Sequence, residues 1–275
     1  NPDEMRAGKA AAEKAMAMAM QAGTDRERRF HYRAECLLQH GGQSYHRQVG
    51  QSCHGPVGPR DRVIAYEKAM HALYDRYPED VETRAFYALA VLAVSYATPT
   101  DTTLSNQLQA AGILEKLWTT NRNHPGVAHY LIHCYDYPAL AKRGLTAAQA
   151  YSLIAPWVPH ALHMPSHIFT RLGMWEESIA ANRSSADASR AYAALRHRTA
   201  TEAEELHALD YMAYSYLQEA QDKKAKEIVD FAATVRETNP ALEFSAAYAL
   251  AAIPARYALE RNAWAEAAAL RVPAV

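Results

Sequence analysis

An all-α fold, arranged as an α-solenoid of stacked antiparallel helix pairs, is predicted from three observations on this sequence. Alanine is abundant, whereas the 275 residues include only 11 glycines, and such a composition favours helices. Apolar residues recur at the spacing of one helix face along nearly the whole chain. A two-helix sequence pattern also occurs more than once, which is typical of repeat architectures.

The predicted helices follow one another with short turns marked by proline, glycine or asparagine. The apolar stretch Phe86–Ala97 is shorter than the roughly 18 residues of a membrane span, and it predicts a core helix. The stretch His40–Arg60 is rich in glycine, glutamine and serine and has no apolar period, so it predicts an inserted loop in one domain over 1–275. The helices are predicted at residues 3–22, 25–39, 61–76, 80–97, 103–120, 125–135, 146–154, 160–172, 175–195, 203–219, 222–237, 241–260 and 263–270.

Three turns carry the repeated pattern. The segment RLGMWEESIAAN places Gly173 in a tight turn and Trp175 at the aromatic position just after it. LERNAWAEAAAL repeats the pattern with Asn262 in the glycine position, and LQEAQDKKAKEI does so with Ala220. Asparagine tolerates the left-handed backbone that such a turn needs, and alanine tolerates it less well. This junction is typical of the tetratricopeptide repeat (TPR), whose first helices line a concave groove.

Composition excludes several classes of function. The chain has 29 basic and 30 acidic residues and no clustered basic stripe, which argues against nucleic acid as a partner. No apolar run is long enough for a membrane span. Three cysteines, Cys36, Cys53 and Cys134, are too few and too irregular for a disulfide framework, and the sequence leaves their redox state open.

Histidines recur in register with the repeat. His129 and His133 are spaced i, i+4, and His163 and His167 follow them at the same spacing, 34 residues later (163 − 129 and 167 − 133). An i, i+4 pair lies on one helix face, with Cβ atoms about 6 Å apart. Each pair is therefore a ready two-ligand unit on a helix that we expect to face the groove.

The neighbouring positions extend this set. His160 lies three residues before His163 and shares its face. Aligning Gly173 with Ala220 places three more residues in the equivalent register of the next repeat, namely His207, Asp210 and Tyr214. Three adjacent inner helices would then direct histidines and a carboxylate into one groove.

This chemistry predicts a transition-metal site. Neutral imidazole is the commonest metal-binding side chain, and histidine-rich sites suit copper, iron or zinc rather than magnesium or calcium. The predicted ligands are His129, His133, His163, His167 and His207. An open coordination position would activate water, dioxygen or a substrate, so a metal-dependent enzyme is one interpretation. Additional ligands or supporting partners are predicted among His160, Asp210, Asp136, Tyr130, Tyr214 and Glu82.

Two other interpretations stay open. The groove of such a solenoid also suits a metal-free scaffold that holds a peptide, a partner protein or a small molecule. A helical histidine is also often just a half-buried polar residue, and duplication of an ancestral repeat would multiply it without any metal. Arg256, on the last inner helix, is a candidate anchor for an anion.

The segments NHPGVAHYLIHCYDYPALAKRGL, APWVPHALHMPSHIFTRLGMWEESIAAN and EELHALDYMAYSYLQ resemble signature segments of a large group of bacterial TPR proteins. The resemblance spans about Asn1 to Leu270, and the loop His40–Arg60 departs from it. It implies a TPR fold but no established activity. It also implies that the chain is truncated or processed relative to the family's length, and that a periplasmic or cell-envelope location is to be expected alongside a cytoplasmic one.

Overall fold

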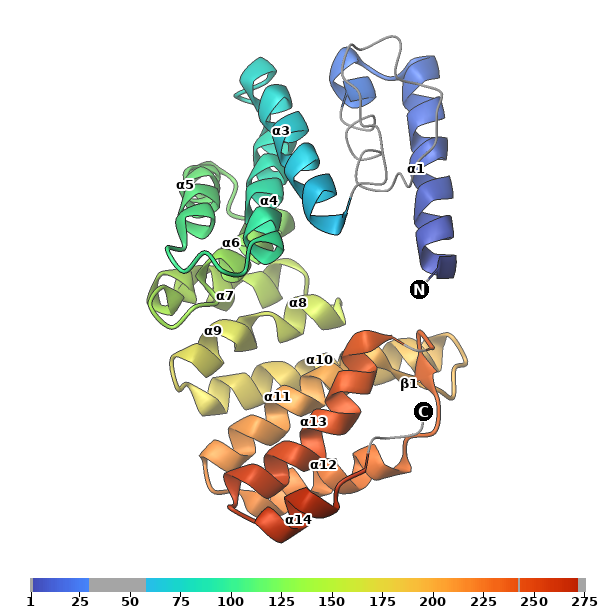
Figure 1. Cartoon of the computed structure of the whole chain (residues 1–275), viewed down its shortest axis with the longest axis vertical. Coiled ribbons are helices and arrows are strands. Elements are labelled where there is room, and N and C mark those ends of the chain that lie inside the picture. Colours follow the sequence, from blue (N-terminus) through green and yellow to red (C-terminus); the bar gives the residue numbers. More distant parts are fainter. Residues whose placement is uncertain (1, 30–57, 242, 272–275) are drawn as a thin grey trace. The chain divides into compact units, whose positions relative to one another are not determined.

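The computed structural model describes residues 2–29, 58–241 and 243–271, and its regular structure is almost entirely helical, as Figure 1 shows. The all-α prediction is confirmed. Cys36, Cys53 and all but the end of the predicted loop at residues 40–60 lie outside the described residues, whereas Cys134 is buried as a free thiol. None of the described helices is long and apolar enough to cross a membrane.

The chain divides into two compact units, Asn1–Arg122 and Asn123–Val275, where the sequence predicts one domain. The first unit contains α1 (Pro2–Ala22), α3 (Pro59–Arg76), α4 (Val81–Ala97) and α5 (Ser105–Thr120). Helix α4 packs against both α3 and α5, and its buried face includes Tyr87, Val91 and Leu92. The stretch Phe86–Ala97 is thus part of a core helix, as predicted.

The second unit holds all the predicted histidine ligands. Its helices pack mainly on their neighbours along the chain: α6 on α7, α7 on α9, α10 on α8, α9 and α11, and α11 on α12 and α13. A core around Leu206, Leu209 and Ile253 joins α11 to α13. A continuous solenoid through the chain stays a prediction. The helices of this unit are α6 (Pro125–Tyr135), α7 (Ala141–Ile154), α8 (Pro159–His163), α9 (Pro165–Arg171), α10 (Trp175–Leu195), α11 (Ala203–Gln218), α12 (Asp222–Thr234), α13 (Phe244–Glu260) and α14 (Trp264–Ala269).

Three local features differ from the sequence prediction. Helix α7 begins at Ala141, five residues before the helix predicted at 146–154. The helix predicted at 160–172 is divided into α8 and α9 at Met164, because Pro165 has no N–H to donate to the preceding turn. The helix predicted at 222–237 ends at Thr234, since the chain then enters β2 (Thr238–Asn239). This strand pairs in parallel with β1 (Thr201–Glu202), a two-residue ladder that the helical periodicity does not indicate.

The three predicted repeat turns share one backbone geometry. Gly173, Ala220 and Asn262 all have positive φ, at 70°, 54° and 57°. In each turn the next residue's N–H bonds to the carbonyl five residues back, for example Gln221 to Tyr216 at 2.8 Å. This pattern closes the end of a helix with its orphan carbonyls satisfied. Two of the three positions therefore hold a side chain in a conformation that suits glycine.

We expect Ala220→Gly to stabilise the protein by about 0.5–1 kcal/mol, because relief of the left-handed alanine exceeds the extra entropy of an unfolded glycine. Ala220 is exposed, so no packing is lost. Ala180→Gly, at an exposed position inside α10, is the matched control and should destabilise by about 1 kcal/mol. Urea unfolding of both variants measures the difference. Equal destabilisation by both would contradict the assigned turn.

Candidate metal centre

The first group of histidines forms where α6 meets α8. His124 caps α6 by accepting the N–H of Val127 through Nδ1 at 3.2 Å, and Pro125 starts the helix. The helical spacing then places His129 and His133 on one face, while α8 presents His160. The ligating atoms of these three residues lie within 4.8 Å of one another. We call them the first trio.

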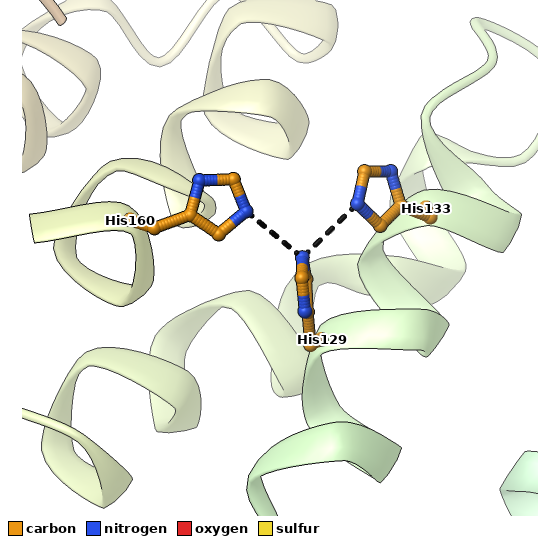
Figure 2. Close-up of side chains that lie close together, drawn as sticks. All are labelled: His129, His133 and His160. Atoms are coloured by element: carbon orange, nitrogen blue, oxygen red, sulfur yellow. Dashed lines mark hydrogen bonds between the residues drawn. The ribbon is translucent and has the colours of Figure 1, made fainter. Parts of the chain in front are cut away.

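In the first trio, the Nε2 atoms of His133 and His160 both approach the Nε2 atom of His129 (Figure 2). His129 Nε2 lies 3.0 Å from His133 Nε2 and 3.1 Å from His160 Nε2. A single ring nitrogen carries either one proton or one lone pair, so it cannot make two well-directed hydrogen bonds in its plane. Two nitrogens bonded to one tetrahedral zinc ion at about 2.0–2.1 Å stand about 3.3 Å apart, a few tenths of an ångström more than the spacing found here.

The second trio consists of His163, His167 and His207, whose ligating atoms also lie within 4.8 Å of one another. His163 is fully buried, and the other two are partly buried. The Nε2 atoms of His163 and His167 are 3.0 Å apart, although a proline separates α8 from α9 between them. His207 comes from α11, and its ring centre lies 4.4 Å from that of His163.

The opposite ring nitrogens of the second trio are held by oxygens. His163 Nδ1 lies 2.6 Å from Asn182 Oδ1, and His167 Nδ1 lies 2.9 Å from Asp136 Oδ2. In a neutral ring, an oxygen acceptor at Nδ1 places the proton there and directs the Nε2 lone pair to the opposite side. The Nε2 atoms of His163 and His167 point at each other at 3.0 Å, so a cation shared by both, a metal ion or a proton, fits between them.

The two trios lie side by side. His133 of the first trio and His167 of the second have ring centres 6.2 Å apart, and His160 and His163 have ring centres 6.3 Å apart. Within a trio the closest ring centres are 4.4–4.9 Å apart. Each trio thus keeps one of the predicted i, i+4 pairs and adds a third histidine from another helix, His160 of α8 or His207 of α11.

Burial keeps most of these imidazoles neutral. Desolvation, reinforced by neighbouring histidines, lowers the pKa of His129 to about 3 and that of His133 to about 4. The same causes hold the pKa of the fully buried His163 well below its usual value, and burial also lowers the pKa of His207. Neutral imidazole is the form that binds metals, so these rings need lose no proton to act as ligands at neutral pH.

A cavity of about 500 Å³ opens beside the second trio, with His167 and His207 in its wall. Two carboxylates line it, each paired with its own arginine. Arg171 Nε bonds Asp136 Oδ1 at 2.8 Å, and Arg256 bonds Asp210 through Nε at 2.7 Å and Nη2 at 3.2 Å. Tyrosine side chains form much of the remaining wall, from Tyr211, Tyr214 and Tyr248.

The other sequence-predicted residues fall into four places. His160, predicted as an outer candidate, is a full member of the first trio. Asp136 supports His167, and Tyr130 packs its ring 5.5 Å from that of His129. Asp210 and Tyr214 line the cavity rather than joining the histidines that can hold a metal. Glu82 belongs to α4 in the other unit.

Four residues that contact the histidines were not predicted. Tyr211 packs on His163, His167 and His207, and its hydroxyl is 3.3 Å from His167 Nδ1. Glu204 Oε2 lies 3.4 Å from His160 Nδ1. Both share a face with His207 at i+4 and i−3, so helical spacing from His207 would have found them. Asn182 and Tyr151, which stacks on His129, reach the site from other helices and leave no such signal.

No family model matches the chain, and neither a curated protein nor a solved structure is significantly similar to it. The functional interpretation therefore depends on the geometry of the trios and the cavity.

Gly144 on α7 allows the close approach of the helices that carry the histidines. A Cβ at this position would lie 2.8 Å from Ile168 Cδ1 on α9 and 3.0 Å from Tyr135 Cβ on α6. We expect Gly144→Ala to destabilise the protein by about 1–3 kcal/mol through overpacking. Gly112→Ala on α5 meets no atom within 4 Å and should instead stabilise by about 0.5–1 kcal/mol. Thermal unfolding of the two variants in opposite directions would support this packing.

Proposed function

We propose that this protein binds two transition-metal ions, one in each histidine trio. The observation that carries the proposal is the pair of Nε2 atoms of His163 and His167, which face each other at 3.0 Å while oxygens occupy both Nδ1 positions. Two nitrogen lone pairs at this distance would repel, and a cation held by both, a metal ion or a proton, removes the repulsion. The Nε2 atoms of His133 and His160 both lie next to Nε2 of His129, which supports the same role for the first trio.

Three protein ligands for each ion suit a site that works on another molecule. Structural zinc sites are closed by four protein ligands, whereas catalytic sites keep a position open for water or substrate. Each trio supplies three imidazoles, so each bound ion has at least one open position. The open position of an ion in the second trio would face the cavity, because His167 and His207 line its wall. This supports a metal-dependent enzyme.

The donor set favours copper or zinc over iron. Imidazole suits all three metals, but non-haem iron sites commonly add a carboxylate ligand. Here the nearest carboxylate, Asp136, contacts the back of His167 and already pairs with Arg171. For a given set of nitrogen donors, affinity rises from iron to copper and falls again at zinc. We therefore expect copper to bind most tightly, then zinc, then iron.

The three matching turns at Gly173, Ala220 and Asn262 support a TPR-type arrangement around this centre. Such a solenoid also suits the metal-free alternative, a scaffold for a peptide or partner protein. The two functions differ in one measurable respect. A scaffold requires no metal, and its histidines would act by contacting the partner.

Metal content tests the proposal. The protein purified in native form, or reloaded with copper or zinc, should hold two ions per chain, one for each trio. His129→Gln and His167→Gln should each reduce the content to one ion, since each removes one of three ligands from one trio. His71→Gln, an exposed histidine in the first unit, is the matched control and should leave two. Fewer than about 0.1 ion per chain after reloading would contradict metal binding.

Asp136→Asn tests how the second trio is supported. Loss of the negative charge behind His167 should weaken metal affinity there by about 10–100-fold, as outer partners of ligating histidines do. The first trio should keep its affinity. Asp187→Asn, which removes an exposed carboxylate paired with Arg190, is the control and should change neither site. Competition titration with a chromophoric chelator resolves the two affinities, and equal values for wild type and Asp136→Asn would show that the carboxylate plays no part.

A further inference from the structure

We infer that the cavity beside the second trio is the binding site of a small organic acid, whose carboxylate lies near the bound ion and the guanidinium groups of Arg171 and Arg256. This inference rests on the proposed metal binding and adds the class of molecule that reaches the metal. The cavity volume of about 500 Å³ lies within the usual range for small-molecule sites.

The balance of charge around the cavity favours an anion. Both carboxylates in its wall are already neutralised, Asp136 by Arg171 and Asp210 by Arg256. The ligands of the second trio are histidines, whose side chains bring no negative charge to compensate that of a bound ion. A negatively charged ligand entering from the cavity would supply that compensation.

The arginines keep donors for such a ligand. Arg171 bonds Asp136 only through Nε, and Arg256 bonds Asp210 through Nε and Nη2. Among the described residues, both Nη atoms of Arg171 and the Nη1 atom of Arg256 have no further hydrogen-bond partner. Planar guanidinium groups match the two oxygens of a carboxylate, and such charge-assisted hydrogen bonds are among the strongest in proteins. Arg256 is also the residue that the sequence indicates as an anion anchor.

The rest of the wall favours an unsaturated or aromatic body on the acid. Tyr211, Tyr214 and Tyr248 line the cavity from α11 and α13. Tyr248 is about half exposed at 49%, which places it at an accessible part of the wall. Tyrosine rings contribute broad apolar surface and offset or edge-to-face contacts with a flat ligand. An aromatic carboxylate fills both requirements, with its charged end at the arginines and its ring among the tyrosines.

Calorimetric titration of the zinc-loaded protein tests this site with benzoate as the probe and benzamide as its uncharged analogue. Benzoate should bind at least about tenfold more tightly, the difference that charge-assisted hydrogen bonds supply. Arg171→Gln should weaken benzoate binding by about tenfold, and so should Tyr248→Ala. Arg256→Lys keeps the charge beside Asp210 but loses the planar fork, and it serves as a second variant if Arg171→Gln does not fold.

Matched controls lie outside the cavity. Arg261→Gln and Tyr192→Ala remove an arginine and a partly exposed tyrosine elsewhere in the same unit, and neither should alter the affinity for benzoate. Zinc content is measured on every variant, so that a lost ion is not mistaken for a lost ligand. Equal affinity for benzoate and benzamide, or indifference to both cavity variants, would overturn the inference.

The same titration separates this inference from the metal proposal. Protein that holds two zinc ions but shows no preference for benzoate overturns the organic-acid site and leaves metal binding intact. Protein that takes up no zinc overturns metal binding. Titration of this zinc-free protein with benzoate and benzamide then tests the organic-acid site separately. A benzoate preference that Arg171→Gln removes would support the organic-acid site without the ion, and absence of that preference would reject it.

Discussion

Packing several imidazole rings together inside one helical unit imposes the constraint on which the rest of the site depends. Buried rings this close cannot all become imidazolium cations, and the lowered pKa values of His129, His133, His163 and His207 reflect that cost. Each neutral ring then has one N–H and one lone pair to direct at its neighbours. Oxygens of Asn182 and Asp136 at the Nδ1 atoms of His163 and His167 hold these two rings so that their Nε2 atoms face each other. The protein holds its histidines in a state that a cation would stabilise.

The helical repeat made part of this site predictable. The i, i+4 spacing identified His129 with His133 and His163 with His167, and the turn alignment added His207. The division into two trios was not predictable, because it depends on how α8 and α11 face α6 and α9. His160 therefore emerged as a full member only in three dimensions. Asn182 was missed for the same reason, since a lone asparagine on α10 gives no indication of the helix it will contact.

The fold was predictable where local chemistry decides it. Proline at the first position of α6 and the positive-φ turns at Gly173, Ala220 and Asn262 are local signals, and the structure follows them. The two-residue ladder between β1 and β2 depends on residues 37 positions apart (238 − 201), and no local pattern encodes it. Pro165 was visible in the sequence, but its effect is small: it separates α8 from α9 while His163 and His167 still meet. The i, i+4 spacing thus still brings the two side chains together across the break in the helix.

The six histidines of the two trios lie within residues 129–207 of the second unit. Ions bound there would raise the free energy of unfolding of that unit alone, by an amount that grows with the logarithm of free metal concentration. The heat resistance of the second unit would then follow the supply of metal, whereas that of the first would not. Thermal unfolding would then show two transitions, and only the transition of the second unit would shift with metal concentration.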